Sequence, residues 1–109
     1  MDASEPGLLS RLWDEHLRAS FPPHVRGREF EHEGRLFDMV LLDADIAGCV
    51  SSSLSGPLDE QRQGLLLVCL AAVEKVLPSI DDEAGAIEYY ERLREMAALA
   101  VGIGHVDAL

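Results

Sequence analysis

The longest apolar run of the chain limits most strongly how it can fold. Ten consecutive residues, 64–73, carry no polar side chain. This run is far shorter than the roughly 20 apolar residues that a membrane-spanning helix needs. It lies between Pro57 and Pro78, and prolines favour the start and the end of a helix because they lack an amide hydrogen. We therefore predict a helix from Pro57 to Leu77, capped at Gly56, in the centre of a helical bundle.

The first apolar stripe predicts an amphipathic helix from Leu8 to Phe21. Apolar side chains recur there with the helical period on one side, and charged side chains occupy the other side. The stripe consists of Leu8, Leu9, Leu12, Trp13, His16 and Leu17. The two prolines that follow Phe21 cannot continue a helix, so they end it.

A second amphipathic helix is predicted from Asp82 to Val101. Ser79 resembles its N-cap, and acidic residues follow in the first turn, where the helix dipole favours them. Its apolar stripe consists of Tyr89, Tyr90, Leu93, Met96, Ala97, Ala100 and Val101. Gly102 and Gly104 are expected to end this helix.

The segment from Leu36 to Leu54 allows two interpretations. As a helix it is apolar almost all round, which is typical of a helix buried inside a bundle. Alternatively, Leu36–Leu42 is a buried strand, and Asp43 caps a helix that begins at Ala44. We favour the helix, because a lone strand needs partners that the rest of the chain hardly offers.

The segment before it is the least regular part of the sequence. Residues 24–35 contain two apolar side chains, and Glu33-Gly34 can form the turn of a short hairpin near residues 27–38. The predicted fold is therefore all-α, a small bundle of about four helices, with or without this minor β-hairpin. We expect a single domain over residues 1–109, with flexible tails at 1–6 and 103–109.

The net charge of the chain disfavours polyanionic partners. Its 109 residues include nine Lys and Arg against twenty Asp and Glu, which gives a formal net charge of −11. Nucleic acids and anionic membranes attract basic proteins, so we expect neither as a partner. The acidic excess lies mainly in residues 36–109. It favours a basic protein or a metal cation as the ligand, or it serves to keep the protein soluble.

The two cysteines and the N-terminus indicate a cellular compartment. Cys49 and Cys69 lie within apolar runs, and no C-x-x-C motif occurs, so we expect buried, reduced thiols. The first residues are acidic where a secretory signal would be basic and then apolar. We therefore predict a cytoplasmic protein.

Four residues are candidates for a functional site. Asp43 is expected to point into an apolar face, where a carboxylate needs an arginine, a helix N-terminus or a ligand. His16 lies within the first apolar stripe, either as a core histidine with one hydrogen bond or as a metal ligand together with Asp43. Glu29 and His32 form one E-x-x-H motif, a spacing that helical bundles use to hold di-iron or dimanganese centres. Such centres require this motif twice, and it occurs once here.

Motifs for catalysis are missing from the sequence. The serines at 51–55 lack a G-x-S-x-G setting, and neither a Walker motif nor G-x-G-x-x-G occurs. We predict a regulatory, non-catalytic interaction module without a cofactor, which forms a homodimer and binds a basic protein partner, as an immunity or antitoxin-like protein would. The alternatives are a metal-binding bundle or enzyme that uses His16, Asp43 and the Glu29–His32 segment, and a structural domain of a larger complex.

Overall fold

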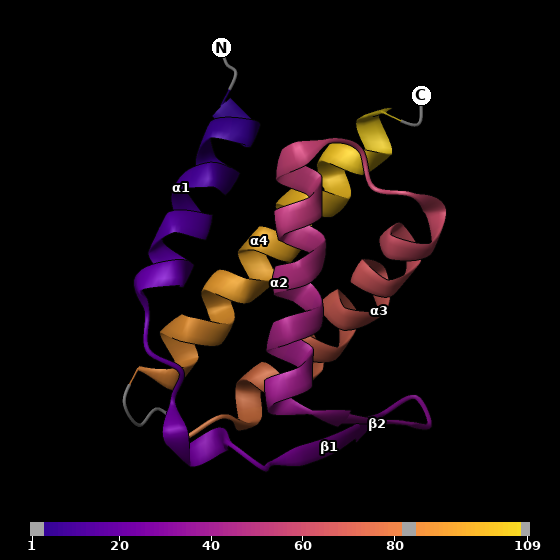
Figure 1. Cartoon of the computed structure of the whole chain (residues 1–109). Coiled ribbons are helices and arrows are strands. Elements are labelled where there is room, and N and C mark those ends of the chain that lie inside the picture. The colour runs from indigo at the N-terminus through magenta and orange to yellow at the C-terminus, as the bar shows by residue number, and fades with distance from the viewer. Residues whose placement is uncertain (1–3, 82–84, 108–109) are drawn as a thin grey trace.

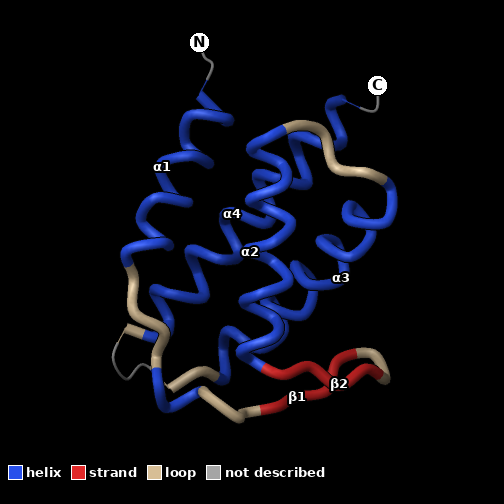
Figure 2. The backbone as a smooth tube through the Cα atoms, viewed as in Figure 1, coloured by secondary structure: helices blue, strands red, loops and turns tan. Residues whose placement is uncertain are grey.

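Four α-helices and one short antiparallel hairpin make up the described part of the chain (Figures 1 and 2). The computed structural model describes the backbone of residues 4–81 and 85–107 and the side chains of residues 7–81 and 85–102. The elements are α1 (Ser4–Arg18), β1 (Glu29–His32), β2 (Arg35–Asp38), α2 (Met39–Ser55), α3 (Glu60–Val76) and α4 (Ala86–Asp107), with single 3₁₀ turns at Pro23–Val25 and Leu77–Ser79. The predicted all-α bundle with a minor hairpin is confirmed.

The helix α4 occupies the centre of the bundle. It packs against each of the other three helices, and in Figure 1 it runs diagonally behind α2, with α1 on one side and α3 on the other. Its buried side consists of Ala86, Tyr89, Tyr90, Leu93, Met96, Ala97 and Ala100. Apart from Ala86, these residues belong to the stripe that the sequence predicted, whose remaining member, Val101, is half-buried.

The helix α3 lies at the flank of the bundle, so the prediction that residues 64–73 form a central helix is wrong. Leu66, Cys69, Ala72 and Val73 are buried, whereas Leu67 and Val68 are exposed. An apolar run allows burial on every side, but the neighbouring helices cover one side of α3. Among the described residues, no helix combines the length and the hydropathy that crossing a membrane requires.

The segment from Leu36 to Leu54 is part strand and part helix, so the favoured prediction of one continuous helix is wrong. The strand β2 ends at Asp38, and the Asp38 carboxylate accepts hydrogen bonds from the amides of Val40 and Leu41 at 2.9 and 3.0 Å. This cap starts α2 at Met39. The alternative interpretation, with a strand to Leu42 and a cap at Asp43, placed the boundary too late.

A second acidic cap moves the start of α3. The Asp59 carboxylate accepts a hydrogen bond from the amide of Arg62 at 2.8 Å, so the helix begins at Glu60. The prediction that it begins at Pro57 is therefore wrong. Ser79 is no cap for α4 either, because its hydroxyl donates to the Val76 carbonyl and α4 begins at Ala86.

The hairpin turn is the one that the sequence predicted. The register pairs Phe30 with Phe37 and His32 with Arg35, which leaves Glu33 and Gly34 as a two-residue loop. Their φ angles are 52° and 78°, and positive φ at both positions is the signature of a type I′ turn. The rings of Phe30 and Phe37 stack with their centroids 5.4 Å apart and hold the two strands together.

The first and the last helix along the chain also differ from their predicted extents. Leu17 was assigned to the apolar side of the first helix, and it is exposed. The helix α4 continues to Asp107, past the two glycines that were expected to end it. The predicted tails overlap α1 and α4, which include residues 4–6 and 103–107. The rest of these tails, residues 1–3 and 108–109, and the predicted acidic first turn at 82–83 lie outside the described residues.

Candidate functional site

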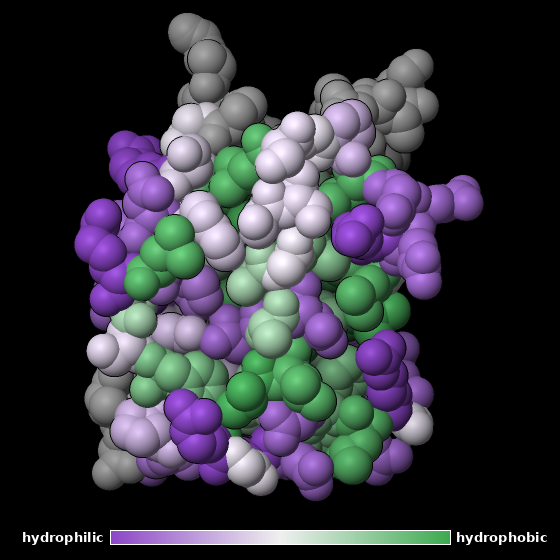
Figure 3. Space-filling view, viewed as in Figure 1, coloured by the Kyte–Doolittle hydropathy of each residue, from purple (hydrophilic) through white to green (hydrophobic). Residues whose placement is uncertain are grey.

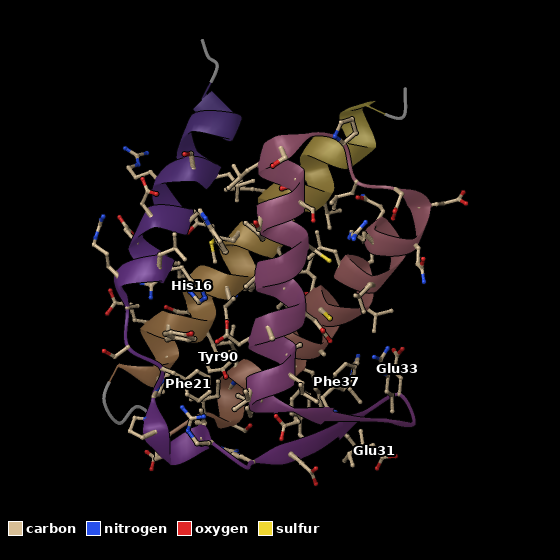
Figure 4. All side chains as sticks on the ribbon, in the orientation of Figure 1. His16, Phe21, Glu31, Glu33, Phe37 and Tyr90 are labelled. Carbon is tan, nitrogen blue, oxygen red and sulfur yellow. The ribbon has the colours of Figure 1, made fainter. Side chains whose placement is uncertain are left out.

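Two candidate residues, His16 and Asp43, meet Tyr89 where α1, α2 and α4 pack together. His16 Nε2 donates a hydrogen bond to Asp43 Oδ1 at 3.0 Å, and the Tyr89 hydroxyl donates to Asp43 Oδ2 at 2.6 Å. Each oxygen of one carboxylate is therefore satisfied by a donor from a different helix. The Asp43 side chain is 15% exposed, and Figure 4 shows His16 pointing from α1 into the bundle.

Aromatic rings flank His16 and Tyr89 in this cluster. The His16 ring lies 6.1 Å from the Trp13 ring and 4.9 Å from the Tyr89 ring, measured between centroids. The edge of Phe21 meets Tyr89 at 5.5 Å, and the buried Tyr90 hydroxyl donates to the Met39 carbonyl at 2.9 Å.

The tyrosine hydroxyls of this cluster remain protonated donors. Burial raises the pKa of Tyr89 above the ordinary 10.0, and the hydrogen bond to Asp43 and the negative charge of Asp43 raise it further. The pKa of Tyr90 is raised chiefly by burial and secondly by the charge of Asp43.

His16 is buried and forms one hydrogen bond, from Nε2 to Asp43. This contact also brings together the two residues of the metal-ligand alternative. Nε2 faces a carboxylate and must carry a proton, whereas Nδ1 is buried without a hydrogen-bond partner among the described residues. His16 and Tyr89 are buried, and the Asp43 side chain that they contact is 15% exposed. The cluster can therefore fix the positions of three helices relative to one another.

Tyr89 is the member of the cluster that the sequence analysis missed as a polar residue. It was assigned to aromatic packing on α4, which its burial confirms. A buried tyrosine usually finds a partner for its hydroxyl, and Asp43 was the one carboxylate expected to point inward. These two observations together could have indicated the hydrogen bond.

Glu29 and His32 lie apart from the cluster, on the hairpin strand β1. In a strand, residues three positions apart point to opposite faces, so the E-x-x-H spacing does not bring them together as it would in a helix. His32 Nε2 instead lies 3.8 Å from Glu33 Oε2. Within the described residues, no group of three or more His, Cys, Asp or Glu side chains is placed to hold a metal ion.

The two cysteines are free and buried, as the sequence predicted. Burial is the main cause that raises the pKa of both thiols, and it brings the pKa of Cys69 to about 11. Both thiols are therefore protonated near neutral pH and are poor nucleophiles.

A second candidate site is an acidic groove formed by α1, α3 and α4. It has a volume of about 580 Å³ and is lined by Leu12, Glu15, Glu74, Glu88, Glu91, Arg92, Arg94, Glu95 and Ala98. Its five glutamates come from three helices, and none of them forms an ion pair with another described residue. One of its two arginines, Arg92, lies over the Tyr89 ring at 5.7 Å. The groove thus offers several unpaired carboxylates to one ligand.

Comparison with protein-family models, with curated proteins and with solved structures finds no match to this chain.

Proposed function

We propose that the chain is a non-catalytic protein-interaction module that binds a basic segment of another protein in the acidic groove. The observation that carries this proposal is the set of unpaired glutamates that three helices bring to one groove. Carboxylates gathered in a concave surface attract cationic side chains, speed the encounter with a basic partner and repel acidic competitors.

The buried cluster supports a structural role for His16 and Asp43. Catalysis requires groups that a substrate can reach. His16 is buried against the rings of Trp13 and Tyr89, and both oxygens of the half-buried Asp43 accept hydrogen bonds from His16 and Tyr89. We therefore place the function on the surface of the bundle and not in its interior.

The proposal includes a regulatory role, a homodimer and a cytoplasmic location. Free thiols at Cys49 and Cys69 are compatible with a reducing compartment. A dimer would cover large apolar side chains that the single chain leaves exposed, such as Leu41 and Val68. An immunity or antitoxin-like protein, which neutralises a basic nuclease, is one function with this chemistry.

The experiment that tests the groove compares two double variants with the same change in net charge. Glu91→Lys with Glu95→Lys alters the groove, whereas Asp14→Lys with Glu60→Lys alters exposed positions that do not line it. The probe is a helical peptide rich in Lys and Arg, and its affinity is measured by calorimetry at low and high salt.

The groove variant is expected to lose roughly tenfold or more in affinity, and the control variant much less. The affinity of the unaltered protein should fall as salt rises, because partly exposed charges are screened. Equal losses in both variants would show that the peptide responds to net charge alone and would refute the groove as the binding site.

A further inference from the structure

The outward side of α2 differs from that of every other helix because its exposed residues are uncharged. Leu41, Ala44, Gly48, Ser51 and Ser55 are exposed and alternate at spacings of three and four, so they form one narrow strip. Exposed positions of α1, α3 and α4 include charged residues. Figure 3 shows this face, where pale and green residues follow α2 and purple residues lie on either side.

A shallow groove runs beside the strip, between α2 and α3. Its volume is about 360 Å³, and its lining consists of Ala44, Asp45, Gly48, Cys49, Ser52, Arg62 and Leu65. A Cβ atom added at Gly48 would meet no atom within 4 Å, so the centre of this face is open. Large apolar side chains are also left uncovered on these two helices. Leu41 is 62% exposed at one end of the strip, and Val68 of α3 is 40% exposed.

Two charges of opposite sign border this groove. Asp45 lies on its α2 side and Arg62 on its α3 side. Arg62 is next to the middle of α2, because the Cys49 thiol donates to the Arg62 carbonyl at 3.7 Å. Asp45 lies one turn closer to the start of α2 than Cys49 does, so the acid and the base occupy different levels along the helix.

We infer that this face binds a second copy of the chain, with the two α2 helices packed antiparallel about a two-fold axis near Gly48. Gly48 is the midpoint between Leu41 and Ser55. In an antiparallel pair that crosses at Gly48, the strip of one copy therefore lies on the strip of the other. Each Leu41 is then covered by the small residues at the opposite end of the other copy's strip. Small side chains at the crossing allow two helix backbones to approach closely.

The same axis explains the charges beside the strip. It carries Arg62 across to the level of α2 at which Asp45 of the partner subunit lies, and by symmetry this contact occurs twice. Within its own chain Arg62 contacts the Asp59 carboxylate at 3.1 Å in an exposed pair, and the second copy adds Asp45 as a second carboxylate beside it. This inference specifies the dimer included in the proposed function, and it is independent of the acidic groove on α1, α3 and α4.

The first experiment places a large charge on the axis. Gly48→Arg replaces a helical glycine in open space, so it should not impair folding, and the matched control is Gly7→Arg on α1, which is also exposed and open. The oligomeric state of each variant is measured by sedimentation over a range of concentrations, and circular dichroism verifies the helix content.

We expect the unaltered chain and Gly7→Arg to be dimers and Gly48→Arg to dimerise roughly tenfold or more weakly. A monomer for the unaltered chain would refute both the dimer and this interface. A dimer that Gly48→Arg leaves intact would refute the interface and leave the proposed dimer standing.

The second experiment tests the two-fold arrangement by exchanging charges. In the Asp45→Arg variant, residues 45 and 62 that face each other across the dimer are both basic. In the Arg62→Asp variant they are both acidic. Like charges repel, so each variant alone should dimerise weakly. Mixing the two variants should restore dimers, because every contact in the mixed dimer pairs an acid with a base. Failure of the mixture to associate more strongly than either variant would refute this arrangement.

Discussion

Asp43 illustrates how a half-buried carboxylate can be stabilised without a basic residue that is always charged. It accepts one hydrogen bond from His16 and one from Tyr89, on two different helices. Hydrogen bonds to an ionised acceptor are stronger than those between neutral groups, and a low local dielectric strengthens them further. The arrangement links α1 and α4 to α2 at a single side chain.

Replacement of Asp43 by alanine is expected to destabilise the protein by about 2–5 kcal/mol, since two buried donors lose their acceptor. Tyr89→Phe should cost less, about 1–2 kcal/mol, because it removes one of the two hydrogen bonds. In the double variant the two effects should not add, because Asp43→Ala already abolishes the bond that Tyr89→Phe removes. Chemical denaturation measures the free energy of unfolding of the two single variants and the double variant. The control is Asp14→Ala at an exposed position, whose free energy of unfolding should stay within about 0.5 kcal/mol of that of the unaltered chain. Full additivity would show that the hydrogen bond contributes nothing to stability.

The stability of the protein is expected to fall steeply in alkaline solution. The folded state holds the protons of Tyr89 and Tyr90 more tightly than the unfolded state does, because burial raises both pKa values above 10.0. This contribution is complete below about pH 10 and is lost as the pH rises towards the folded pKa values. Cys69, with its pKa raised to about 11, acts in the same direction. Urea unfolding at a series of pH values measures this loss of free energy. Tyr90→Phe should make the free energy of unfolding depend less steeply on pH in the alkaline range. An unchanged dependence would contradict the contribution of Tyr90.

For single residues of the cluster, sequence analysis identified Asp43 and His16 as unusual but did not identify all of their hydrogen-bond partners. Asp43 and His16 stood out because a polar group within an apolar stripe requires an explanation. Tyr89 did not stand out, because a tyrosine on an apolar stripe is already explained by packing. The contact joins residues 46 positions apart, and their proximity depends on how α2 and α4 cross.

Among the elements, the hairpin offers a clear opportunity for stabilisation. Glu33 adopts a positive φ of 52°, which an ordinary side chain tolerates poorly, and Gly34 follows it. Glu33→Asn would create the Asn-Gly sequence that type I′ turns favour, so it should stabilise the protein by about 0.3–1 kcal/mol. Thermal unfolding measures the change. The control is Glu31→Asn, which makes the same charge change within the strand and should give no gain; a similar gain in both variants would attribute the effect to charge.

The boundaries of the elements show what hydropathy patterns leave undetermined. The pattern from Leu36 to Leu54 contains a strand and a helix that are both apolar, so periodicity does not separate them. The boundary is set by Asp38, whose carboxylate caps the helix, and by the pairing of β2 with β1. At α3, both glycine-proline and aspartate are plausible helix starts, and Asp59 forms the cap.

For the molecule as a whole, the final helix is expected to be indispensable. It packs against each of the other three helices and buries large side chains such as Tyr90, Leu93 and Met96. A chain that ends before Glu88 would leave the apolar sides of α1, α2 and α3 without their common partner. We expect it to lose cooperative thermal unfolding and most of its near-ultraviolet circular dichroism. Retention of a cooperative transition would show that α4 is not required for the core.

The fold class followed from the sequence, but the arrangement of the helices did not. Four segments with helical character and short connections predict a bundle. Which helix lies in the centre depends on the packing of whole surfaces, and the chain places amphipathic α4 there and the more apolar α3 at the flank. The acidic groove likewise combines residues from α1, α3 and α4, so the sequence revealed its charge but not its shape.

The central position of α4 affects the order in which the protein can be made. A ribosome releases the chain from its N-terminus, so α1, α2 and α3 emerge before the helix that joins them. Until residues 86–107 follow, the apolar surfaces that α4 covers on these three helices are exposed and can associate with other molecules. Completion of this bundle must therefore wait for α4, and until then chaperones would encounter a domain that lacks its central helix.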